Sequence, residues 1–220
     1  MPLIKKLHSK LGFQLIPLLA AVVIPLEQKG WSEISFGKIP VNKVTHSAGE
    51  LNIQVKSSAS PLVYKLERLT KIKSLQIKLK FNGDLKAPAS AGKWEEDSLF
   101  RIGLVANGDK TLSSVKKLFA PDWVKRLFAL APDGVGLDKI YFFNVGRLSS
   151  QVGLSRAHPK SELMNEEIVA FRKAGENSLT IDKVLTPPIS AAALWISVDG
   201  DDTNSEFQTS IENITLQTEE

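Results

Sequence analysis

Apolar and polar residues alternate with a period of two along much of this chain, which is the pattern of β-strands with one buried face. The runs that show it, or shorter versions of it, are 51–56, 75–81, 100–104, 168–171, 179–181 and 207–211. Residues 193–198 are apolar at nearly every position, which predicts a strand in the centre of the core. A one-residue change of phase between Ile211 and Ile214 predicts a β-bulge.

One segment has a helical period instead. After Pro121, a residue suited to the first turn of a helix, Trp123, Leu127 and Phe128 fall on one face. We expect Trp123 and Phe128 to anchor this helix to the core, and contact with a ligand is the alternative. Many short strands, few helices and no βαβ alternation predict an all-β fold. The expected architecture is an antiparallel β-sandwich or jelly roll with a short helical insertion (about 112–131), and a barrel is the alternative.

The first 26 residues have the pattern of a secretory signal. Lys5 and Lys6 precede an uncharged, mostly apolar stretch at 15–26. Its 12 residues fall short of the roughly 20 that span a bilayer as a helix. A cleaved signal peptide therefore ranks before an uncleaved N-terminal anchor, and a buried strand or helix of the domain is the third alternative. The predicted organisation is 1–26 as signal peptide or anchor and 27–220 as a single β-sandwich domain, periplasmic or secreted.

Charge and composition exclude several classes of function. Three of the 28 basic residues lie before residue 27, so residues 27–220 carry 25 basic and 24 acidic residues. This balance lacks the excess of positive charge that is typical of nucleic-acid-binding proteins. The chain has no cysteine, which excludes disulfides, thiol nucleophiles and thiolate metal sites. It also lacks a Gly-x-Ser-x-Gly elbow, a phosphate-binding glycine loop and a dinucleotide fingerprint. Whether the protein is an enzyme is uncertain, and these absences favour a non-catalytic role.

The densest cluster of oxygen ligands is the turn 199–204, which reads Asp-Gly-Asp-Asp-Thr-Asn. Calcium takes six to eight oxygen ligands, and Asp199, Asp201 and Asp202 are candidates to supply some of them. The alternative is a plain hairpin turn whose Asp and Asn side chains bind their own backbone. No cofactor is required by the sequence, and a structural calcium is the one candidate.

A second constellation joins Asp97 and Arg101, which share a face of a strand because their separation is even. A carboxylate and a guanidinium so placed are expected to form an ion pair that stabilises the fold. The alternatives are contacts to a polar ligand, or carboxylate catalysis of the glycosidase type with neighbouring Glu95 and Glu96.

Two loops carry further candidate ligand contacts. Trp94 lies in a polar, glycine-containing loop, where its ring is suited to stacking on a sugar or to covering an edge of the core. The long loop 148–165 carries or adjoins Arg147, Arg156 and His158. Long loops on a rigid sandwich often bind ligands, although a solvated connection is the alternative.

The second half of the chain resembles a family of exported bacterial proteins, domain-of-unknown-function family 3047. The elements that carry the resemblance are Trp94-Glu95-Glu96-Asp97, Arg101, Ile140-Tyr141-Phe142-Phe143-Asn144-Val145, Asp182, Asp199, Asp201 and Thr203. It implies an exported β-sandwich over roughly residues 31–217, without an established activity, and it adds Tyr141 to the candidate ligand contacts. The family's aromatic strand ends in Trp where this chain has Phe143 or Asn144. Its sandwich is similar to carbohydrate-binding jelly rolls at the level of fold.

Together these features predict an extracytoplasmic, non-catalytic β-sandwich that binds a glycan or other cell-envelope material. The first alternative is a polysaccharide hydrolase or lyase that uses carboxylates on its strands. The second is a structural envelope protein that binds other proteins through a sheet edge. The expected partner is carbohydrate or an envelope component, without nucleic acid and with membrane contact only through an uncleaved signal.

Overall fold

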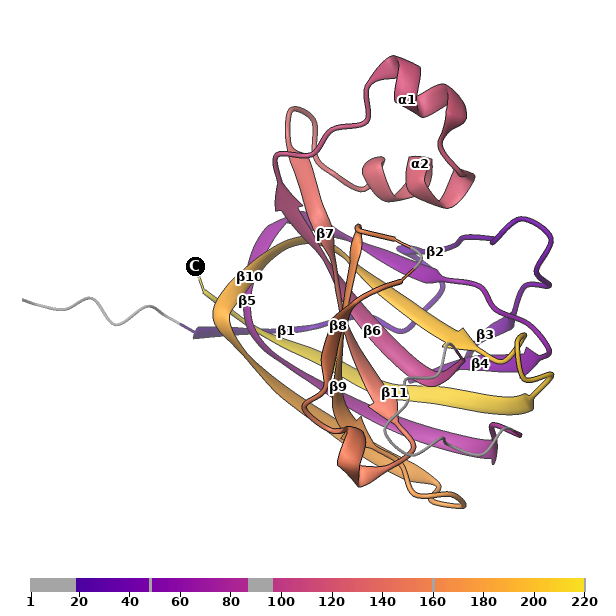
Figure 1. The fold of residues 1–220 in the computed structure, drawn as a ribbon. Helices are drawn as coiled ribbons and strands as arrows, with labels where there is room; N and C mark the ends of the chain where they lie inside the picture. The colour runs from indigo at the N-terminus through magenta and orange to yellow at the C-terminus, as the bar shows by residue number, and fades with distance from the viewer. Residues whose placement is uncertain (1–18, 48, 87–96, 160, 220) are drawn as a thin grey trace, which may run out of the picture.

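The described part of the chain forms one 11-stranded sheet that is folded so that two of its parts face each other (Figure 1). The computed structural model describes residues 19–47, 49–86, 97–159 and 161–219. Its strands are β1 (Leu19–Val23), β2 (Trp31–Glu33), β3 (Lys43–Ser47), β4 (Glu50–Lys56), β5 (Leu62–Asp84), β6 (Ser98–Gly108), β7 (Gly136–Gly146), β8 (Ser155–Ala157), β9 (Met164–Phe171), β10 (Ser178–Asp199) and β11 (Glu206–Glu219). The helices are α1 (Ser114–Phe119), α2 (Asp122–Phe128) and the short 3-10 helix η1 (Ser149–Gln151).

The two longest strands, β5 and β10, turn this sheet into a sandwich. They pair with each other along most of their length, with register shifts between Val184 and Ile189 and between Ala191 and Ala193. Such irregularities bend a strand and increase its twist. The first layer has the order β3-β4-β11-β5-β10, and the second continues from β5 and β10 through β6, β7, β9 and β8. The predicted all-β sandwich with a helical insertion near 112–131 is confirmed.

Alternate residues of the second layer fill two hydrophobic clusters, because successive side chains of a strand point to opposite faces. Phe100 and Ile102 of β6 point between the layers into the larger cluster. Val105 of β6 and Trp195 of β10 point to the outer face and join a second cluster. Burial on both faces explains why residues 193–198 are apolar at nearly every position.

Helix α2 covers part of this outer face. Leu127 is 1 % exposed within the second cluster, and Trp123 and Phe128 pack against that cluster from the same helix. The expectation that Trp123 and Phe128 anchor the helical insertion is therefore confirmed. Figure 1 shows the two helices together at one end of the sandwich, beyond the ends of β6 and β7.

One detail of the strand predictions is confirmed and two are refined. The bulge expected near Ile211 is confirmed by a register shift between Ile211 and Asn213. The runs at 179–181 and 193–198 belong to one strand, β10, rather than to two. The predicted long loop 148–165 contains η1, β8 and the beginning of β9, and β9 pairs in parallel with β7 in an otherwise antiparallel sheet.

The apolar stretch at 15–26 contributes to the folded domain in its described part. β1 pairs with residues 215–219 of β11 and so covers an edge that this strand would otherwise expose. Ile24 is 2 % exposed, Leu26 is 8 % exposed, and both belong to the main core. The folded unit therefore begins before the predicted boundary between 26 and 27.

Residues 1–18 lie outside the described residues, so the signal itself stays a prediction. In the part of the chain that is described, no helix has the length and apolar character to cross a membrane.

Candidate functional site

A pocket of about 250 Å³ opens on the outer face of the second layer. Strands β6, β7 and β10 form its floor, and three chain segments rise around it: α2, the loop near Phe36 and the loop near His158. The turn that follows β10 closes one side with Asp201 and Asp202. We call this cavity the outer-face pocket.

Aromatic side chains give the outer-face pocket its apolar surface. Trp195 and Phe142 are nearly fully buried at the floor, and Trp123 is half-buried beside them. Gly103 of β6 makes room for the ring of Phe142, because a Cβ atom at this glycine would lie 2.8 Å from Phe142 Cε1. Because Gly103 has no side chain, the Phe142 ring can pack directly against β6 at the floor of the pocket.

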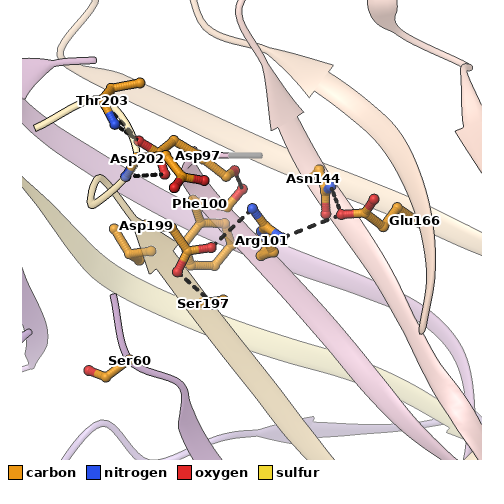
Figure 2. Close-up of polar contacts among 12 residues, drawn as sticks. Ser60, Asp97, Phe100, Arg101, Asn144, Glu166, Ser197, Asp199, Asp202 and Thr203 are labelled. Atoms are coloured by element: carbon orange, nitrogen blue, oxygen red, sulfur yellow. Dashed lines mark hydrogen bonds and ion pairs between the residues drawn. The ribbon is translucent and has the colours of Figure 1, made fainter. Parts of the chain in front are cut away.

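Arg101 is the buried cation at the polar side of this floor. Its Nη2 atom lies 3.0 Å from Asp199 Oδ2, and its Nη1 atom lies 3.4 Å from Glu166 Oε1 (Figure 2). Arg156 Nε and Asn144 Nδ2 also donate to Glu166, at 2.8 and 3.2 Å. Since Glu166 is 2 % exposed, these donors compensate a carboxylate that would be costly to bury alone.

Asp97 supports the pocket wall by holding the turn after β10. Its carboxylate accepts hydrogen bonds from the backbone nitrogens of Asp202 (3.3 Å) and Thr203 (2.8 Å) and from the Thr203 hydroxyl (2.6 Å). The expectation that Asp97 forms an ion pair with Arg101 is corrected, because the described ion pairs of Arg101 lead to Asp199 and Glu166. The physical reason is that Asp97 precedes β6, where the turn's N–H groups are within its reach.

Burial raises the pKa of the Asp199 carboxyl above its ordinary value. The guanidinium of Arg101 and a hydrogen bond from Ser197 oppose this effect, and the nearby carboxylates of Asp201 and Asp97 reinforce it. Among the described residues that line the pocket, carboxylates outnumber the guanidinium of Arg101, and neighbouring charges act on the protonation of Asp199 in both directions.

Two of the three residues predicted to share a calcium ion contact other groups. Asp199 pairs with Arg101. The backbone of Asp202 is bound by Asp97. Among the residues that the structure describes, no group of three or more His, Asp or Glu side chains is placed to hold a metal ion. The Asp97 side chain, from outside the turn, also binds the turn's backbone, which the sequence pattern did not indicate. The structural calcium stays a prediction.

The structure brings six of the ten predicted site residues to the outer-face pocket: Asp97, Arg101, His158, Asp199, Asp201 and Asp202. Arg156 reaches the same network through Glu166. Arg147 lines a separate small hollow that shares Asp97 with the pocket.

Two predicted contacts lie elsewhere. Tyr141 packs against the inner cluster, its hydroxyl donates to Asp138 at 2.9 Å, and it lines another groove. Tyr141 faces the opposite side of β7 from Phe142 and therefore lies outside the outer-face pocket. It lines a neighbouring groove together with Arg156, and its role as a ligand contact stays a prediction. Trp94 lies outside the described residues.

Sequence reasoning missed the aromatic floor and Glu166. The sequence predicts Trp195 as part of a core strand and Trp123 as a core anchor, with a ligand contact as the alternative for Trp123. One signal could have found Glu166: it stands in phase with apolar Met164 and Ile168, where an inward-facing charge is unusual. The pairing of β9 with β7 that brings Glu166 near Arg101 has no local sequence signal.

Neither a family model nor a curated protein sequence matches this chain. Among solved structures, a xylan-binding module, CBM15, is 14% identical and covers 90% of this chain and 96% of its own, with a TM-score of 0.39. The mannan-recognising module TmCBM27 is 15% identical, covers 92% and 98%, and has a TM-score of 0.36. The tailspike protein 4 domain of bacteriophage CBA120 is 7% identical, covers 87% and 20%, and has a TM-score of 0.39. At these TM-scores the likenesses carry no conclusion about a ligand.

Proposed function

We propose that this protein is an extracytoplasmic, non-catalytic glycan-binding β-sandwich that holds a sugar unit in the outer-face pocket. The observation that supports this most directly is the combination of aromatic rings and hydrogen-bonding groups in one concave site. Trp123, which is half-buried, offers an apolar surface to the C–H face of a sugar ring beside the buried rings of Trp195 and Phe142. Arg101 and Ser197 supply polar groups in the same pocket. An apolar cavity with a few fixed polar groups is the usual form of a ligand site.

The charge of the pocket narrows the class of glycan. Asp97, Asp199, Asp201 and Asp202 line it, and the guanidinium of Arg101 is shared between Asp199 and Glu166. This acidic excess disfavours uronic acids and phosphorylated sugars and favours neutral or amino sugars. The volume of about 250 Å³ falls slightly below the usual range of roughly 300–1,000 Å³ for ligand pockets, which suits a single unit or a chain end.

A polysaccharide hydrolase is the alternative, and one observation favours it. Burial raises the pKa of Asp199 beside the carboxylates of Asp201 and Asp97, and an acid with a raised pKa next to an ionised one is the arrangement of glycosidases. Binding accounts better for the geometry, because the oxygens of Asp97 are engaged by the turn and Asp199 is engaged by Arg101.

The experiment is a glycan-array screen of the purified chain, followed by titration of its tryptophan fluorescence with each hit. We expect neutral or amino-sugar hits and a loss of binding in Trp123→Ala. Tyr141→Phe is the matched control, because this aromatic residue faces the other side of its strand and should leave the affinity unchanged. No hit, or equal loss in both variants, would refute the site. Release of reducing ends from a hit would favour the hydrolase.

The extracytoplasmic part of the proposal rests on the predicted signal. Fractionation of a producing bacterium should find the protein outside the cytoplasm. Replacing Lys5 and Lys6 with Glu should trap it inside, because the basic head of a signal is needed for its insertion. Cytoplasmic protein from both versions of the gene would refute this part and leave the glycan proposal intact.

A further inference from the structure

Helix α1 presents an apolar face to solvent. Val115, Leu118 and Phe119 are 68 %, 76 % and 85 % exposed, and no residue of the helix is buried. Their spacing places the three side chains on neighbouring positions of one helical face. Figure 1 shows α1 beyond α2, at the far end of the helical insertion from the sheet. Exposed apolar groups that gather in this way mark interaction surfaces.

The helical insertion that carries this apolar face is rich in basic residues. Residues 111–128 contain four basic residues, Lys116, Lys117, Lys125 and Arg126, and a single acidic one, Asp122. Lys116 and Lys117 are consecutive residues of α1 on the sides of the helix away from the apolar face, and both are exposed. Apolar side chains flanked by lysines are the pattern of a helix that lies in a membrane interface, where anionic head groups pair with the basic residues.

We propose that α1 docks this protein on an anionic lipid surface, with Val115, Leu118 and Phe119 entering the interface and Lys116 and Lys117 contacting the head groups. The basic charge of the insertion favours anionic lipid over a second copy of the chain, since two such basic segments would repel each other. α2 holds α1 to the sandwich through buried Leu127, so docking requires no unfolding of the domain. This inference is independent of the proposed glycan site.

The chain has no cysteine, which allows a single reporter to be placed at will. Leu118→Cys carries an environment-sensitive fluorophore such as NBD on the full chain. The matched control is Val184→Cys, an apolar residue in β10 that is 72 % exposed. The probe is a vesicle of equimolar phosphatidylcholine and phosphatidylglycerol, with a vesicle of phosphatidylcholine alone as the neutral comparison.

We expect the fluorophore at 118 to shift to the blue with anionic vesicles, less with neutral ones, and less at high salt. The fluorophore at 184 should not shift. Equal shifts at both positions, or none at 118, would overturn the proposal. A concentration-dependent shift at 118 without vesicles would show that a second copy covers the face and would also overturn it.

A label-free measurement guards against disturbance by the fluorophore. In vesicle co-sedimentation, Phe119→Ser should lower the partition coefficient about tenfold, the effect of removing one aromatic side chain from an apolar medium. Val184→Ser should leave it unchanged. Both variants keep residues 1–18, so any lipid affinity of that segment cancels. An unchanged partition coefficient in Phe119→Ser would contradict docking through α1.

Discussion

The guanidinium of Arg101 on β6 lies 3.0 Å from the carboxylate of Asp199 on the adjacent strand β10, at the polar side of an aromatic pocket. Arg101 is directly opposite Ser197 in the ladder, so Asp199 is its diagonal neighbour on the same face. Both residues are buried, at 7 % and 8 % exposure. Stability and the shape of the outer-face pocket therefore depend on the same pair.

Removing the cation of this pair should be strongly destabilising. Arg101→Leu leaves the buried Asp199 facing an apolar side chain and deprives Glu166 of one donor. Breaking a buried pair in this way costs about 3–5 kcal/mol of unfolding free energy. The double variant Arg101→Leu with Asp199→Asn should lose less than Arg101→Leu alone, because it buries one charge fewer. Urea unfolding at neutral pH measures both.

The matched control for this comparison is Lys71→Met. Lys71 also forms an ion pair, with Glu219 at 2.7 Å, but its side chain is 55% exposed. Its loss should cost no more than about 1 kcal/mol. Equal losses in Arg101→Leu and Lys71→Met would show that the Arg101 pair is not buried in solution.

The free energy of unfolding should change with pH because of the protonation of Asp199. Burial, only partly opposed by Arg101, holds the pKa of Asp199 above its ordinary value in the folded protein. The folded state therefore binds this proton more tightly than the unfolded chain. The contribution of Asp199 to stability thus falls as pH rises from about 3.9, its ordinary pKa, to the raised folded pKa.

Asp199→Asn removes this contribution, so the wild-type protein should lose stability relative to the variant across that window. Unfolding titrations at a series of pH values measure the difference between the two proteins. A second variant, Asp122→Asn, changes an 83% exposed carboxylate and should show no such slope. A difference between wild type and Asp199→Asn that grows in the opposite sense would contradict the raised pKa.

Signal processing should spare residues 19–26. Removal of β1 exposes an edge of β11, and removal of Ile24 and Leu26 takes two buried side chains from the core. Ile24→Ala alone should cost about 2–5 kcal/mol, whereas Val23→Ala, at 63 % exposure, should cost little. Intact-mass measurement of the exported protein should find its N-terminus at or before residue 19. A stable mature protein that begins at residue 27 would contradict this prediction.

The aromatic floor should depend on Gly103. In Gly103→Ala the new methyl group overlaps the Phe142 ring and the Ile140 side chain. Overpacking of this kind costs about 1–3 kcal/mol, and displacement of Phe142 should weaken glycan binding beyond the loss of folded protein. Adding Phe142→Leu should recover part of the stability but not the binding. Wild-type stability and affinity in Gly103→Ala would show that the floor is more open than described.

The sequence alone determined the elements with strong periodicity. Alternation at 51–56, 75–81 and 100–104 predicted strands, the phase change near Ile211 predicted a bulge, and the spacing of Trp123 and Leu127 predicted a helix against the core. These signals are local, because each strand or helix must bury one face whatever it packs against. The sequence also selected Asp97, Arg101 and Asp199 as unusual polar residues.

Only the tertiary structure decided which of these residues meet. Arg101 pairs with Asp199, 98 positions later in the chain, and with Glu166, and strand pairing brings these residues together. β9 lies parallel to β7, whereas the turn signals in the sequence predict antiparallel hairpins. The face on which Tyr141 and Phe142 lie depends on register, and a shift of one residue exchanges them. Pairing and register are set by non-local contacts, so the pocket could be recognised only once the sheet was folded.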